Sequence, residues 1–190
     1  MRIVGGTHRG RTFYPPKNLP VRPTTDFGKE ALFNILANRV AFESVHALDL
    51  FCGTGSISYE LASRGCTAVT AVDEDYACCA FVKKTSDEFG LDGIKVIKNE
   101  VFRFLKNEKK QFDLIFADPP YEFRDTSKLP ELIFGSDLLK PDGLLIIEHP
   151  AELNFEKETF FLEKRNYSKV NFSLLKKRFE KGLKNDRTGQ

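Results

Sequence analysis

The sequence predicts an α/β protein built on a doubly wound, mostly parallel, Rossmann-like sheet. Between residues 45 and 148, short apolar runs of strand length alternate with segments that carry apolar residues at helical spacing. The strand-like runs lack polar residues at alternate positions, which indicates a parallel sheet covered by helices on both faces. Two further β-like runs near the C-terminus predict an antiparallel hairpin and bring the sheet to seven strands. A chain of 190 residues fits one such domain.

The first predicted element is a short β-hairpin arm. Two β-like pieces, Arg2–Val4 and Arg11–Tyr14, are separated by glycines at positions 5, 6 and 10. Glycines between short strands favour a turn. The four prolines between residues 15 and 23 then keep the chain extended and out of a helix.

A helix is predicted after the arm, followed by alternating strands and helices. Thr25 or Asp26 can cap this first helix, Glu30 lies near its positive end, and the apolar spacing continues to about Arg39. The remaining predicted elements are strands at 45–51, 68–73, 94–98, 112–117 and 143–148, helices at 56–64, 75–89, 101–106 and within 128–139, and hairpin strands at 159–165 and 169–175.

Charge is distributed unevenly along the chain, which divides it into three predicted parts. Residues 1–25, the predicted arm, hold five basic side chains and no acidic one, whereas the whole chain has a net charge of only +2. Residues 26–178 form the predicted α/β domain, and residues 179–190 form a basic tail. A basic arm on an acidic body favours binding of a polyanion at one edge, because displaced counterions supply affinity.

Several classes of protein and of site are disfavoured by composition. No apolar run approaches the roughly 20 residues of a membrane span, and the N-terminus lacks the pattern of a secretory signal, so we expect a cytoplasmic protein that does not enter a membrane. The four cysteines have no zinc-ligand spacing, and we expect them to be reduced and buried, with no metal site. Cys52 lies in a glycine loop without a local histidine partner, which disfavours thiol catalysis.

A glycine loop follows the first predicted core strand. Gly53 and Gly55 let the backbone turn tightly and approach a ligand, and Asp73 ends the next strand 20 residues after Gly53, where a carboxylate can reach ribose hydroxyls. The third glycine of a dinucleotide site is replaced by Ser58, and Asp49 precedes the loop. An acidic residue there suits a cofactor with an ammonium group and a sulfonium, so S-adenosylmethionine is favoured over NAD.

The tetrapeptide Asp118-Pro119-Pro120-Tyr121 follows the fourth core strand, at the edge where open α/β sheets bind ligands. The lone pair of an exocyclic amine on a base is delocalised into the ring, which makes the amine a poor nucleophile. The Asp118 carboxylate and the Pro119 carbonyl can accept its N–H bonds and draw the nitrogen toward an attacking geometry. Tyr121 can stack on the splayed base. This motif therefore predicts amine methylation.

These motifs resemble those of Rossmann-type amino-methyltransferases, and the N-terminal third narrows the resemblance to the RsmD family. The segments that carry it lie within residues 1–175 and are 2–6, 9–11, 22–26, 29–36, 49–51 with Gly53 and Gly55, 63–65, 118–121 and 148–149. That family methylates N2 of a guanine in bacterial small-subunit (16S) ribosomal RNA, with S-adenosylmethionine as cofactor. The resemblance thus implies a methyltransferase sheet and, as partner, this RNA or an assembling small ribosomal subunit.

The resemblance also implies roles for individual residues. The implied cofactor-binding residues are Asp49, Phe51, Gly53, Gly55, Asp73, Glu74, Glu100, Val101, Arg22 and Thr24. Asp49 and the two glycines would border the methionine part, Asp73 would hold the ribose, and Glu100 would lie near the adenine amino group. Arg22 and Thr24 would line the open side of the cofactor. Asp118, Pro119, Pro120 and Tyr121 would act on the amine, and Arg9, Arg11 and Arg22 would meet RNA phosphates.

Two positions depart from the pattern of the family. Position 100 is Glu where the family usually has Asp, which would shift the adenine contact, and position 52 is Cys where a small residue is usual. The basic tail has no role in that pattern. Nothing in the sequence indicates a coiled coil or an obligate interface, so we expect a monomer.

Two other functions remain open at this point. An adenine-N6 methyltransferase acting on DNA or RNA would use the same tetrapeptide, although the chain has no separate target-recognition domain. A protein that binds RNA but has lost catalysis is the other, and the intact Asp118 and glycine loop disfavour it.

Overall fold

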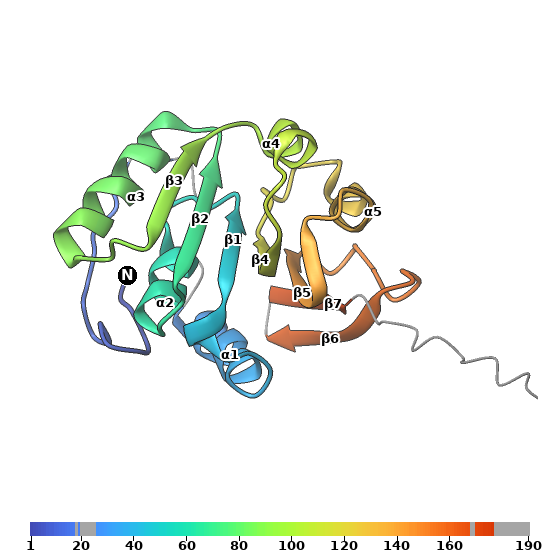
Figure 1. Ribbon diagram of the computed structural model, residues 1–190, viewed down its shortest axis with the longest axis horizontal. Coiled ribbons are helices and arrows are strands. Elements are labelled where there is room, and N and C mark those ends of the chain that lie inside the picture. The colour runs from blue at the N-terminus through green and yellow to red at the C-terminus, as the bar shows by residue number, and fades with distance from the viewer. Residues whose placement is uncertain (18, 20–25, 168–169, 177–190) are drawn as a thin grey trace, which may run out of the picture.

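The computed structural model describes residues 1–17, 19, 26–167 and 170–176 of the protein (Figure 1). Its helices are α1 (Asp26–Ala37), α2 (Ser56–Ser63), α3 (Tyr76–Phe89), α4 (Val101–Asn107) and α5 (Leu129–Gly135), with short 3-10 turns η1 (Phe42–Ser44) and η2 (Thr126–Lys128). Its strands are β1 (His46–Leu50), β2 (Ala68–Asp73), β3 (Ile94–Lys98), β4 (Phe112–Ala117), β5 (Leu139–His149), β6 (Phe161–Tyr167) and β7 (Val170–Lys176).

The seven strands form one sheet in the order β3-β2-β1-β4-β5-β7-β6. Neighbouring strands from β3 to β5 pair in parallel, whereas β7 pairs antiparallel with both β5 and β6. The predicted doubly wound sheet with an antiparallel last hairpin is therefore confirmed. The strand order reverses between β1 and β4, and in open α/β sheets such a switch point opens a crevice at the carboxyl ends of the strands.

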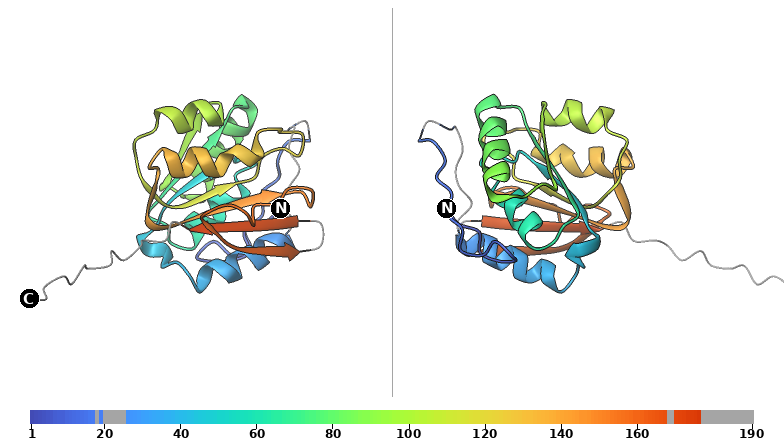
Figure 2. Two further views of the ribbon diagram at one scale, coloured as in Figure 1. Left: turned by 90° about the vertical axis from the view of Figure 1, so that its right-hand side faces the viewer. Right: turned by 60° about the vertical axis from the view of Figure 1, so that its left-hand side comes forward.

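Helices cover both faces of the sheet, as the unbroken apolar strands predict. On one face, α1 and α2 pack through Leu32, Phe33 and Leu61, and on the other α4 and α5 pack through Phe104 and Ile133. Figure 2 shows α1 on the opposite side of the sheet from α4 and α5. Alternate residues of each strand point to alternate faces, so the parity of a residue number within a strand gives its face.

The N-terminal arm folds back on itself and packs against α2 and α3. Its predicted hairpin is present with a single bridge, between Arg2 and Thr12, in place of two regular strands. Ile3 and Phe13 are buried in a cluster with Tyr59 of α2 and Val82 of α3. The arm thus shares an apolar core with the sheet domain.

A close approach of backbones explains the glycine at position 6 of the arm. Gly6 has φ 74°, and a Cβ at this position would lie 1.9 Å from the carbonyl oxygen of Ser63 at the end of α2. The Thr7 amide donates to this carbonyl oxygen at 2.7 Å, and the Ser63 hydroxyl donates to the Gly5 carbonyl at 2.7 Å. Only glycine allows the arm to lie this close to the helix.

A buried ion pair ties the arm to two helices. Lys29 of α1 and Glu60 of α2 are both fully buried, with Lys29 Nζ 3.4 Å from Glu60 Oε1. The Lys29 ammonium also donates to the Arg2 carbonyl at 2.5 Å, and the Val4 amide donates to Glu60 Oε1. Burial lowers the pKa of Lys29, and the charge of Glu60 opposes that shift.

The predicted bounds differ from the structure mainly at β5 and α5. We predicted a strand from residue 143, but β5 begins at Leu139, and its pairing with β4 is interrupted by a shift between Phe112 and Leu114. Asp142 has φ 62° within this irregular stretch. Residues 139–142, which the sequence places before the strand, therefore belong to β5 as an irregular first part. Helix α5 ends at Gly135 and so stops short of the strand. Among the described residues, no helix has both the length and the apolar character needed to cross a membrane.

Candidate active site

Four carboxylates reach the same edge of the sheet from four parallel strands. Asp49 lies in β1, Asp73 ends β2, Asp118 directly follows β4, and Glu148 lies near the end of β5. Parallel strands end at one edge, and this edge contains the switch point between β1 and β4. The site is therefore assembled by topology from residues that are far apart in the sequence.

The glycine loop is bonded to the end of β2. The Gly53 amide donates to Asp73 Oδ2 at 2.8 Å, and the Asp75 amide donates to Asp73 Oδ1 at 2.9 Å. Gly55, with φ 78°, directly precedes α2. The predicted spacing of 20 residues thus corresponds to a direct bond between loop and carboxylate. A carboxylate accepts about four hydrogen bonds, so Asp73 has capacity for a ligand.

Phe51 adopts a backbone conformation that the sequence did not predict. Its φ is 59°, which is strained for a bulky residue. The ring packs edge-to-face on Phe123 at 5.2 Å, and Phe123 packs on Phe102 at 5.4 Å between ring centroids. The strained turn therefore places Phe51 in an aromatic cluster beside the glycine loop, and strained residues of this kind gather at ligand sites.

Asp49 is fully buried and faces α2. The Ser58 hydroxyl donates to its Oδ2 at 2.5 Å. Burial raises the pKa of Asp49 to about 7, and the charges of Asp118 and Asp73 add to the shift while the Ser58 bond opposes it. The mutual effect of these three carboxylates shows that they form one acidic cluster.

Asp118 and Glu148 lie on the same face of the sheet. Phe116 and Ile146 pack in the cluster that contains α1 and α2, so by parity Asp118 and Glu148, two residues further on, lie on that side. The register pairs Ala117 with Ile147, which makes the next residue of each strand a neighbour. Burial raises the pKa of Asp118 well above its usual range, and the charge of Glu148 raises it further.

The Asp-Pro-Pro-Tyr segment forms a turn beyond β4. The Asp118 amide donates to the Leu50 carbonyl at 3.4 Å, and the Phe123 amide donates to the Pro120 carbonyl at 2.8 Å. Pro119 is buried, whereas Tyr121 is 50% exposed. The Tyr121 ring thus lies at the surface, three residues after Asp118, and its stacking on a base stays a prediction.

Three further predicted cofactor residues surround the end of β3 and the loop after β2. Glu100 caps α4, accepting from the Phe102 and Arg103 amides at 2.8 Å each, so its carboxylate has a local role that the sequence did not predict. Val101 is buried at the start of this helix, and Glu74 is exposed after Asp73. The Ser56 hydroxyl at the start of α2 is buried without a protein hydrogen-bond partner.

The predicted RNA-binding arginines lie away from this edge. Arg11 donates to the Phe89 carbonyl at 3.2 Å, and its guanidinium lies 5.2 Å from the centre of the Phe89 ring, at the C-terminal end of α3. Arg9 is exposed on the same turn of the arm. Arg22 and Thr24, predicted to line the cofactor and in the first case RNA, fall outside the described residues.

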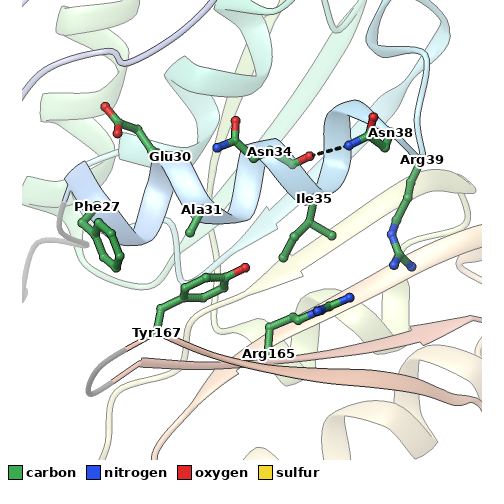
Figure 3. Close-up of a pocket in the computed structure, with 9 residues that line it drawn as sticks. All are labelled: Phe27, Glu30, Ala31, Asn34, Ile35, Asn38, Arg39, Arg165 and Tyr167. Carbon is green, nitrogen blue, oxygen red and sulfur yellow. Dashed lines mark hydrogen bonds between the residues drawn. The ribbon is translucent and has the colours of Figure 1, made fainter.

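A groove of about 490 Å³ runs between α1 and β6. Figure 3 shows the side chains that line it, from α1, from the two residues after this helix and from β6; they are Phe27, Glu30, Ala31, Asn34, Ile35, Asn38, Arg39, Arg165 and Tyr167. The Phe27 and Tyr167 rings pack edge-to-face at 6.3 Å, and Phe27 is 64% exposed. Strand β6 runs parallel to β5, so Tyr167 marks the end of the groove at the carboxyl edge.

A polar network fixes the end of β5 next to Glu148. His149 Nδ1 donates to the Pro150 carbonyl at 2.8 Å, which leaves Nε2 to accept from the Ser173 hydroxyl at 2.8 Å. Burial lowers the pKa of His149, so the imidazole is neutral. Asn171 Nδ2 donates to the His149 carbonyl at 3.4 Å.

Sequence reasoning did not give Glu148 or the rings of Phe102 and Phe123 a part in the site. Glu148 stood out only as part of the family pattern. Glu148 is close to Asp118 because β4 pairs with β5. The signal in the sequence that could have pointed to it is a carboxylate at the end of the predicted strand that follows the Asp-Pro-Pro-Tyr strand.

Within the described segments, no group of three or more His, Cys, Asp or Glu side chains is arranged to hold a metal ion.

Comparison with known proteins identifies the family. Residues 1–176 match the sequence model of a protein family described as Conserved hypothetical protein 95. The chain belongs to this family. A relative from Haemophilus influenzae, named Ribosomal RNA small subunit methyltransferase D, is 32% identical over 78% of this chain and 78% of its own length. YlbH of Bacillus subtilis is 31% identical over 94% of this chain and 100% of its own length. The predicted membership of the RsmD family is confirmed.

Solved structures agree with this assignment. The Escherichia coli protein yhhF superposes with a TM-score of 0.82 at 25% identity, covering 94% of this chain and 98% of that one. The Thermus thermophilus protein TTHA0928 superposes with a TM-score of 0.80 at 29% identity, covering 92% and 98%.

Proposed function

We propose that this protein transfers a methyl group from S-adenosylmethionine to the exocyclic N2 amine of a guanine in small-subunit ribosomal RNA. The observation that carries the proposal is the convergence of Asp49, Asp73, Asp118 and Glu148 at the switch point of the sheet. Relatives of this chain are named as methyltransferases of that RNA.

The acidic cluster fits the proposed cofactor. S-adenosylmethionine carries an ammonium and a sulfonium, and its net positive charge is attracted by clustered carboxylates. NAD carries two phosphates that the same cluster would repel. The buried Ser56 hydroxyl offers a further polar group at the start of α2. When bound, the cofactor supplies a methyl group on a good leaving group.

The residues of this chain would hold the cofactor at the carboxyl edge. Asp73, already bonded to the Gly53 amide, would accept the ribose hydroxyls, and Asp49 with the glycine loop would border the methionine part. Glu100 and Val101 at the start of α4 would meet the adenine. Phe51, and by extension the rings packed on it, would cover the adenine face.

The acceptor amine would bind at the turn after β4. The Asp118 carboxylate and the Pro119 carbonyl accept the two N2 hydrogens, which concentrates the lone pair on nitrogen. Tyr121 stacks on the base. As the new N–C bond forms, nitrogen becomes positively charged and gives up a proton, which Asp118 is placed to accept. The raised pKa of Asp118 favours this role, because the group holds a proton readily.

The RNA would contact two surfaces. Arg9 on the arm is exposed to solvent and can meet phosphates. The groove between α1 and β6 offers aromatic rings at its carboxyl-edge end and, further along, amides and two arginines that both contact Glu163. Aromatic side chains and arginines are the groups that bind unstacked bases and phosphates. We expect a structured part of the RNA to span both surfaces.

One assay tests the proposal. Labelled S-adenosylmethionine is offered with small ribosomal subunits, with naked ribosomal RNA and with DNA, and the products are digested to nucleosides. We expect label in N2-methylguanosine from an RNA substrate. Label in N6-methyladenosine would support the second candidate, an adenine-N6 methyltransferase, which the Asp-Pro-Pro-Tyr turn would equally serve. No label in any nucleic acid would contradict both.

A further inference from the structure

We propose that Glu148 is the residue that makes the site specific for guanine, by accepting the guanine N1–H beside the amine held at Asp118. This inference rests on the proposed function, and it assigns the choice of base to a residue outside the Asp-Pro-Pro-Tyr motif. Asp118 and Pro119 accept N–H groups from an amine, and both guanine and adenine carry one. These two residues therefore cannot distinguish the bases.

The fold places Glu148 where the ring nitrogen next to the amine would lie. Asp118 and Glu148 follow the register pair Ala117–Ile147 on adjacent parallel strands and lie on the same face of the sheet. Residues at adjacent positions on neighbouring strands are separated by about 5 Å, the strand spacing. An exocyclic amine and the adjacent ring nitrogen of a purine can thus meet one carboxylate each.

Contacts with β7 and β4 hold the part of β5 that carries Glu148. Its register partner on β7 is Phe172, which is fully buried and packs on Phe116. The neighbouring His149 is held by Ser173 and Asn171. Glu148 itself is 6% exposed. A buried side chain on packed strands suits discrimination between two ligands by hydrogen bonding, because its neighbours limit the positions that its carboxylate can take.

The two bases differ at this ring nitrogen. Guanine presents N1–H and the N2 hydrogens, so its edge offers three donors in a row, whereas adenine presents N6 hydrogens next to an N1 lone pair. All three guanine donors then find acceptors, the N2 hydrogens at the Asp118 carboxylate and the Pro119 carbonyl and the N1–H at the Glu148 carboxylate. With adenine in the same pose, the N1 lone pair would face a carboxylate oxygen and leave a buried acceptor without a donor, which carries the full desolvation cost.

The electrostatics of this edge agree with the assignment. The charge of Glu148 raises the pKa of Asp118, so the two carboxylates repel each other. A base that brings donors to both of them relieves the repulsion, since each donor stabilises the ionised form. Guanine does this at both carboxylates and adenine at one.

The test changes the substrate at the ring nitrogen and keeps the amine. The modified nucleotide is first mapped with the wild-type protein, and RNA is then prepared with either guanosine or 2-aminopurine riboside at that position. 2-Aminopurine keeps the exocyclic amine and lacks only the N1–H and O6 of guanine. We expect the wild-type protein to favour guanosine in kcat/KM by about 10- to 100-fold, the effect of one hydrogen bond to a charged group.

The variant Glu148→Gln completes the comparison. A glutamine can turn its amide N–H toward the N1 lone pair of 2-aminopurine, so the preference for guanosine should shrink by about tenfold or more. Glu148→Asp, which keeps the charge, should lower activity but retain the preference. Glu131→Gln on the exposed face of α5 is the matched control and should behave as wild type. Cofactor binding, measured by calorimetry, should be unchanged in all three variants.

The outcomes separate this inference from the proposed function. Equal rates on guanosine and 2-aminopurine for the wild type would overturn the role of Glu148, even if Glu148→Gln failed to fold. A preference that is unchanged in a folded Glu148→Gln would overturn it as well. Failure of the wild type to methylate any RNA guanine would instead overturn the proposed function.

Discussion

The carboxyl edge of the sheet and the N-terminal arm differ in charge, in construction and in place. The edge is acidic and is built from residues that end parallel strands, whereas the arm is basic and rests on the sides of α2 and α3. The turn of the arm contacts Ser63 and Phe89, the C-terminal ends of these helices. Since α3 has 14 residues, this turn lies about 20 Å from the edge where the helix begins. Chemistry and the predicted phosphate contacts are therefore separated in space.

The largest effect is expected at the edge, from loss of the amine acceptor. Asp118→Ala should lower methyl transfer by about 10³-fold or more, because it removes the carboxylate that we propose to hold the reacting nitrogen. Cofactor affinity should survive, and single-turnover kinetics with calorimetry would check both. Lost cofactor affinity would mean that Asp118 belongs to the cofactor site.

A large effect on stability is expected where the arm joins the domain. Lys29→Met removes the fully buried cation beside Glu60, which keeps Arg64 Nε at 3.5 Å as an ionic partner, and should lower the free energy of unfolding by about 3 kcal/mol. Urea denaturation measures this loss, and Lys83→Met, at an exposed ion pair, is the control with an expected change below about 1 kcal/mol. Equal losses in the two variants would show that the buried pair does not anchor the arm.

A pH-dependent effect of similar size is expected at Asp49. Its folded pKa of about 7 lies above the ordinary value of 3.8, so the folded protein holds a proton that the unfolded chain releases. This contribution to stability is present below pH 3.8 and is lost as the pH rises through 7. Asp49→Asn keeps an acceptor for Ser58 and should stabilise the protein at pH 8 by up to about 4 kcal/mol, at about 1.4 kcal/mol per pKa unit.

The same variant should bind the cofactor more weakly, since the cluster loses a negative charge. Denaturation at pH 5 and pH 8 with calorimetry tests the two effects together. A variant that is less stable than wild type at pH 8 would contradict the raised pKa of Asp49. A variant that binds the cofactor more tightly would contradict the attraction of the cofactor by the acidic cluster.

The smallest effect is expected from the arginines of the arm. Arg9→Ala should reduce the slope of log affinity for RNA against log salt by about 0.7–0.9, the release of one counterion. Arg11 already contacts Phe89, so Arg11→Ala should change the slope less and the stability more. Filter binding across salt concentrations measures both. An unchanged slope in Arg9→Ala would assign the arm a structural role alone.

The fold could be read from the sequence because its signals are local. Strands β2, β3 and β4 have the predicted bounds, since each is an apolar run closed by polar or turn residues. The single bridge of the arm and the early start of β5 were not predicted, because both depend on tertiary contacts, of Gly6 with Ser63 and of β5 with β4.

The site was predictable to the extent that its motifs are continuous in sequence. The glycine loop and Asp73 were found from their spacing and are directly bonded in the structure. Glu148 lies 30 residues from Asp118, and only strand pairing brings them together. The charge of Arg9 and Arg11 was evident, but their distance from the edge follows from where the arm docks. Their contact with RNA and the role of each cofactor residue stay predictions.

The acidic cluster also has a consequence for turnover. After transfer, the sulfur of the cofactor would be a neutral thioether, so the attraction that the carboxylates of Asp49 and Asp73 would exert on the cofactor would weaken as the reaction ends. The charges that would recruit the methyl donor would therefore also favour release of the spent cofactor. We expect such a site to exchange its cofactor readily and to resist inhibition by its own product.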